Sequence, residues 1–86
     1  MPADGLWASM ETFTVSIVNE HFTSTDEIRA ADEQTALQES LKGALAIATE
    51  QVSVGKPFFG AEVTLSRGKE VLSRMVVSVG ASPLKT

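Results

Sequence analysis

One amphipathic helix is encoded by residues 32–57, DEQTALQESLKGALAIATEQVSVGKP. Asp32 is suited to cap the helix N-terminus, because its carboxylate accepts hydrogen bonds from the free amides of the first turn. Gly55 and Pro57 predict the C-terminal end, since glycine adopts a left-handed cap and proline cannot continue the helix. Apolar residues recur every three or four positions and form one stripe, made of Leu37, Leu41, Leu45, Ala48 and Val52.

A β-hairpin is predicted before this helix. Residues 12–18, TFTVSIV, alternate strictly, which places Phe13, Val15 and Ile17 on one face of a strand. The polar residues from Asn19 to Thr25 indicate a turn, followed by a weaker return strand through about Ile28.

A second hairpin is predicted after the helix, in residues 58–80, FFGAEVTLSRGKEVLSRMVVSVG. A three-residue loop at 66–68, with Gly68 in the left-handed conformation, pairs Val63 with Val71 and Phe59 with Met75. This register keeps the apolar side chains of both strands on one face, so it is the expected one.

The order strand, strand, helix, strand, strand predicts an α+β fold in which one helix packs on one face of a four-stranded antiparallel sheet. We expect a single ββαββ domain over residues 11–80, a loosely held N-terminal segment at 1–10 and a C-terminal tail at 81–86. The order of the strands in the sheet does not follow from periodicity. The predicted core consists of Phe13, Val15, Ile17, Leu37, Leu41, Leu45, Phe59, Ala61, Val63, Leu65, Met75 and Val77.

Charge and composition argue against several functions. Eleven acidic and seven basic residues give a net charge of −4, the wrong sign for a nucleic-acid-binding domain. The absence of cysteine removes disulfides, zinc ribbons and thiol nucleophiles, and favours a cytoplasmic protein. No segment approaches the roughly 20 apolar residues of a membrane span. We therefore expect no nucleic-acid partner, no membrane and no cofactor.

Catalytic chemistry has little support in the sequence. His21 is the only histidine, and it stands beside Glu20 in a predicted turn, where a surface role is more common than general-base catalysis. The acidic residues before the helix lack the spacing of a calcium-binding loop. The sequence therefore predicts a protein that is not an enzyme. A small-ligand site that uses His21 with Glu20 or Asp26 is the alternative.

The outer face of the sheet, opposite the helix, is the predicted contact surface. It should carry Val18, Phe58, Leu72 and Val76, more apolar surface than a solvated face requires. Trp7 could cover this face within the chain, or a second copy could do so. Ile47, on an alanine-rich shoulder of the helix, offers another contact. The leading hypothesis is a homodimeric protein-interaction module, or one that binds an unidentified protein, with a possible interface at Trp7, Val18, Ile47, Phe58, Leu72 and Val76.

The segment from Asp26 to Gly80 resembles a family of short bacterial proteins known only as a domain of unknown function. The likeness rests on residues 32–37, which open the helix, and on residues 61–63 through Gly68 to Val71 in the hairpin. This resemblance implies the ββαββ order and no activity. A more distant likeness, to small antitoxin-type domains, implies a regulatory module that dimerises and binds a toxin.

Overall fold

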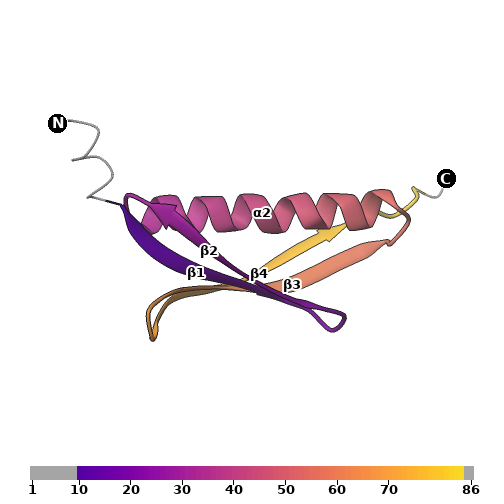
Figure 1. The fold of residues 1–86 in the computed structure, drawn as a ribbon. Coiled ribbons are helices and arrows are strands. Elements are labelled where there is room, and N and C mark those ends of the chain that lie inside the picture. The colour runs from indigo at the N-terminus through magenta and orange to yellow at the C-terminus, as the bar shows by residue number, and fades with distance from the viewer. Residues whose placement is uncertain (1–9, 85–86) are drawn as a thin grey trace.

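The computed structural model describes residues 10–84, which form two hairpins separated by one helix (Figure 1). The first hairpin consists of β1 (Glu11–Val18) and β2 (Thr23–Ala30), and the second of β3 (Phe58–Arg67) and β4 (Glu70–Gly80). Helix α2 (Glu33–Ser53) connects them. The predicted α+β class and ββαββ order are confirmed. Trp7, the predicted N-terminal segment except Met10, and the last two residues of the predicted tail lie outside the described residues.

The strands form one antiparallel sheet in the order β2-β1-β3-β4, so β2 and β4 are its edges. The two hairpins cross beneath α2, and their turns point away from the helix on opposite sides (Figure 1). Pairing between the hairpins covers only Thr14–Val18 of β1 and Glu62–Ser66 of β3. The first four residues of β3 therefore extend beyond the end of β1.

The helix contacts the sheet through small side chains. Its buried residues are Ala36, Ser40, Ala44 and Ala48, which repeat every four positions. Leu37 and Leu41 flank this stripe and are partly buried, whereas Leu45 is 47% exposed. The predicted placement of Leu45 in the core was therefore wrong. Large side chains from the sheet, among them Phe13 and Leu65, fill the interior. The helix therefore packs against them through the face that carries its smallest side chains.

The second hairpin has a different register from the predicted one. Gly68 and Lys69 form a two-residue loop, and Val63 pairs with Met75 instead of Val71. Gly68, the first residue of the loop, has a φ of 60°, whereas Lys69 does not have a positive φ, since only glycines do so between residues 10 and 84. A positive φ at the first loop residue alone is the pattern of a type II′ turn. The predicted three-residue loop was wrong because it did not allow for an irregularity farther along β4.

That irregularity is a shift in register between Leu65 and Ser66, which leaves Leu72 as the extra residue of β4. Leu72 consequently packs against the core instead of lying on the outer face, and Val71 is exposed. The slip from the predicted register is an even number of residues, so Val77 still points inward and is buried. Met75 has the expected orientation but is more than a third exposed, because it lies on an edge strand.

The ends of the helix match the predictions. Asp32 is the N-cap, and its Oδ1 accepts a hydrogen bond of 2.8 Å from the backbone N–H of Thr35. At the other end Gly55 has a φ of 108° and donates to the carbonyl of Val52, while Lys56 donates to that of Gln51. These two bonds constitute a Schellman cap, which satisfies carbonyls that the helix leaves free.

Enlarging a buried small residue of the helix should destabilise the fold. We expect Ala44→Leu to lower the free energy of unfolding by about 1–3 kcal/mol, since the added atoms must separate helix and sheet. Ala46→Leu, on the exposed face, should change it by less than about 0.5 kcal/mol. Urea denaturation of the two variants measures both values. Equal effects would show that α2 does not rest on its small residues.

The N-cap should contribute a pH-dependent part of the stability. The hydrogen bond from the backbone N–H of Thr35 lowers the pKa of Asp32 below its ordinary value. Such a carboxylate stabilises the fold above its unfolded-state pKa, and this contribution is lost as the pH falls through the lower, folded-state pKa. The stability difference between wild type and Asp32→Asn, measured by denaturation, should be constant above about pH 5 and shrink below about pH 4. A difference that did not change with pH would contradict this role.

Candidate interaction groove

A groove of about 440 Å³ lies between the turn of the first hairpin and the beginning of β3. The groove exists because β3 extends beyond Val18, the last β1 residue with which it pairs. The turn between β1 and β2 bends away from this part of β3 (Figure 1). Its lining consists of Val18, Asn19, Glu20, His21, Phe22, Gln51, Lys56, Phe58, Phe59, Gly60, Ala61, Glu62 and Val76. More of this lining is apolar than polar, so the groove is suited to contacts with an apolar group.

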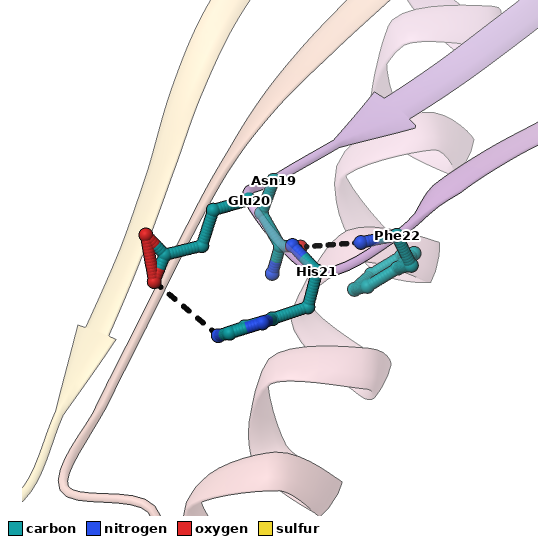
Figure 2. A network of polar contacts seen from close by, with 4 residues as sticks. All are labelled: Asn19, Glu20, His21 and Phe22. Carbon is teal, nitrogen blue, oxygen red and sulfur yellow. Dashed lines mark hydrogen bonds and ion pairs between the residues drawn. The ribbon is translucent and has the colours of Figure 1, made fainter.

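One wall of the groove is the turn, which is held by the side chain of Asn19 (Figure 2). Its Oδ1 accepts hydrogen bonds from the backbone N–H of His21 at 2.8 Å and of Phe22 at 3.0 Å. The N–H of Asn19 in turn donates to the carbonyl of Phe22 at 3.0 Å. Phe22 is thereby directed toward the core, where its ring centroid lies 6.4 Å from that of Phe59.

The opposite wall is formed by Phe58, which is 63% exposed on the outer face of the sheet. Its ring lies over Gly60, so closely that a Cβ atom at that glycine would be 3.0 Å from the ring. Phe58 also pairs with Gly80 on β4, which has no side chain to cover the ring. Two glycines thus leave this aromatic side chain accessible beside the groove.

Two contacts between exposed polar side chains lie at the groove. His21 Nε2 lies 3.3 Å from Glu20 Oε1, and the histidine side chain is 67% exposed (Figure 2). Glu62 accepts a hydrogen bond of 2.7 Å from Arg74. Asp26, the other acidic residue considered for a ligand site, lies on β2 opposite Val15 and does not line the groove. The structure therefore brings only His21 and Glu20 of that proposed set to a concave site.

The described part of the chain contains neither a cluster of metal ligands nor a helix suited to span a membrane. Between residues 10 and 84 no three acidic or histidine side chains converge to hold a metal ion. Over the same range no helix has both the length and the apolar character needed to cross a bilayer.

Three of the predicted interface residues lie on one face. Val18, Glu62 and Val76 occupy successive strands in one row, and Phe58 lies farther along β3 on the same side. We call Val18, Phe58 and Val76 the outer patch. Leu72 and Ile47, by contrast, are partly buried against the core and do not belong to it.

The groove itself was not predicted from the sequence. Its presence depends on how far β3 extends past its partner, which is a property of pairing between hairpins that alternation does not encode. A weak signal was present in Asn19, because asparagine commonly accepts hydrogen bonds from the backbone two residues later and so fixes a turn.

No protein-family model, curated protein or solved structure matches this chain. The resemblance to an uncharacterised bacterial family therefore stays a prediction, and the function must be argued from the geometry.

Removing the Asn19 acceptor should loosen the turn. We expect Asn19→Ala to lower the free energy of unfolding by about 0.5–1.5 kcal/mol, because two backbone donors lose their partner. Asn19→Asp keeps an oxygen acceptor at the same place and should retain most of the stability. Thermal or urea unfolding measures the effect. If both variants unfolded like wild type, the side chain would not hold the turn.

Proposed function

We propose that this protein is a non-enzymatic interaction module that forms a homodimer through the outer patch. The observation that carries the proposal is the exposure of Phe58 at 63% and Val76 at 73% on a face that no other element within residues 10–84 covers. Exposed apolar groups that lie together on a sheet commonly mark a contact with another molecule. The cysteine-free composition supports a cytoplasmic location as part of the same proposal.

Trp7 cannot cover Phe58, because too few residues connect it to β1. Trp7 precedes Glu11 by four residues, a reach of about 14 Å for a fully extended chain. Val18 lies about 23 Å from Glu11 along β1, and Phe58 is farther still beyond the end of that strand. At the other end, residues 81–84 are themselves exposed although they follow directly after Gly80. A second molecule is therefore the favoured cover.

Charge is compatible with an identical partner. The one acidic side chain between Val18 and Val76 in the row is Glu62, and its carboxylate is neutralised by Arg74 at 2.7 Å. Two copies of such a surface meet without like-charge repulsion, which would otherwise oppose self-association.

A small-ligand site is the second candidate, favoured by one observation. The groove combines an apolar lining with Glu20 and His21 at its rim, and its volume falls within the usual range for small-molecule sites. The exposure of both polar side chains gives them little ability to orient a ligand. The dimer remains the proposal with stronger support.

Light scattering tests the dimer directly. Over about 1–100 μM protein, a range in which weak association becomes visible, the wild-type mass should approach twice the 9.1 kDa of one chain. Phe58→Asp and Val76→Asp should shift the protein to monomer, because each places a charge in an apolar contact.

A matched control is available at Val54, an exposed valine at the end of α2 outside the outer patch. Val54→Asp makes the same chemical change as Val76→Asp and should leave the dimer intact. The proposal fails if the wild type is a monomer throughout this range, or if both patch variants remain dimers.

A further inference from the structure

We propose that the second copy joins the sheet at β4, so that two β4 strands pair antiparallel about a two-fold axis at Val76. This inference rests on the proposed homodimer and places its contact at the β4 border of the outer patch, at Val76, instead of over the whole patch. It would join two four-stranded sheets into one, with both helices on the same side.

The two edges of the sheet differ in the way that this pairing requires. The edge strand β2 carries Asp26, Glu27 and Arg29 within eight residues, and charged side chains on an edge strand oppose pairing with another chain. The last six residues of β4, from Met75 to Gly80, contain no charged residue and no proline. The charges and the bulge of β4 lie nearer its turn, at Glu70, Arg74 and Leu72, so the stretch from Met75 to Gly80 is the part of either edge that lacks this protection.

The geometry of β4 restricts the register of such a pair. The irregularity at Leu72 interrupts the strand, so regular pairing is available from Ser73 to Gly80. Side chains of paired residues point to the same face, and along this stretch even-numbered and odd-numbered residues point to opposite faces. An even-numbered residue must therefore pair with an even-numbered residue of the second copy, and an odd-numbered residue with an odd-numbered one. An axis at Val76 uses nearly all of this stretch.

That axis also gives favourable neighbours on both faces. It pairs Met75 with Val77 on the helix side, and it places Arg74 opposite Ser78. An axis at Arg74 itself would place two guanidinium groups opposite each other, which is unfavourable. The chosen register therefore buries apolar side chains at the centre of the pair and separates its charges.

Exposure of side chains along β4 agrees with a partner at this position. Val76 is exposed on the outer face and Met75 is partly exposed on the helix face, so water has access to both sides of one short segment. Gly80 pairs with Phe58, and it would leave the Phe58 ring open toward a strand added beyond β4. Edge pairing therefore accounts for part of the outer patch as well as for Met75.

Hydrogen exchange measured by mass spectrometry tests this arrangement. In an isolated copy, about half of the backbone N–H groups of β4 point away from β3 and should exchange rapidly. We expect this rapidly exchanging half to become slow in peptides covering residues 73–80 when wild-type protein is raised from about 1 to about 100 μM. Peptides covering β2, the charged edge, serve as the internal control and should exchange equally at both concentrations.

Disulfide formation provides a second measurement, because the chain has no cysteine of its own. Val76→Cys should form a covalent dimer on mild oxidation, since the two-fold axis brings both sulfurs together. Thr25→Cys, on the outer face of β2, should stay a monomer under the same conditions.

The outcomes separate this inference from the proposed function. A dimer by light scattering whose β4 amides stay rapid at high concentration would overturn edge pairing and leave the homodimer intact. A protein that never dimerises would overturn the homodimer and edge pairing together. Protection confined to β4, with the Val76→Cys dimer, would establish both.

Discussion

The close approach of α2 to the sheet is the constraint on which the rest of the structure depends. Small side chains at Ala36, Ser40, Ala44 and Ala48 let the helix lie directly on two crossing hairpins. Ser40 adapts to this burial by donating its hydroxyl to the carbonyl of Ala36 at 2.8 Å, so no polar atom is left unpaired there. The larger side chains of the sheet supply the volume of the core, and the helix supplies its cover.

This arrangement also determines where the molecule is accessible. One helix covers one face, and in the described part of the chain no other element covers the opposite face. The groove lies beside Phe58, where β3 extends past β1. The outer patch and the groove share Val18, Phe58 and Val76, which makes them one continuous surface. Its chemistry is mainly that of apolar contact, since most of its lining is apolar and the carboxylate of Glu62 is paired with Arg74.

Much of this fold was predictable from local patterns, and the errors have specific physical causes. Alternation identified β1, β3 and β4, a turn-like composition indicated β2, and Asp32 and Gly55 marked the ends of the helix, because these signals depend on near neighbours. The periodicity of leucines wrongly placed Leu45 in the core. The stripe that packs on the sheet is the neighbouring one of small residues, which includes Ala44, and the pattern of the helix alone does not show this. The register at Met75 depended on a two-residue turn and an extra residue in β4, neither of which alternation reveals. Of the predicted contact residues, Phe58 and Val76 are on the expected face because parity is robust to an even slip.

The unlike edges of the sheet have a consequence for the size of any assembly. Open sheet edges on both sides would permit indefinite stacking of strands into a fibre. In the proposed dimer, pairing through β4 would use the uncharged stretch from Met75 to Gly80 of each copy and would leave two β2 strands at the outside, each bearing Asp26, Glu27 and Arg29. The proposed pairing would therefore stop at two copies, because the charged side chains of β2 oppose the addition of further strands.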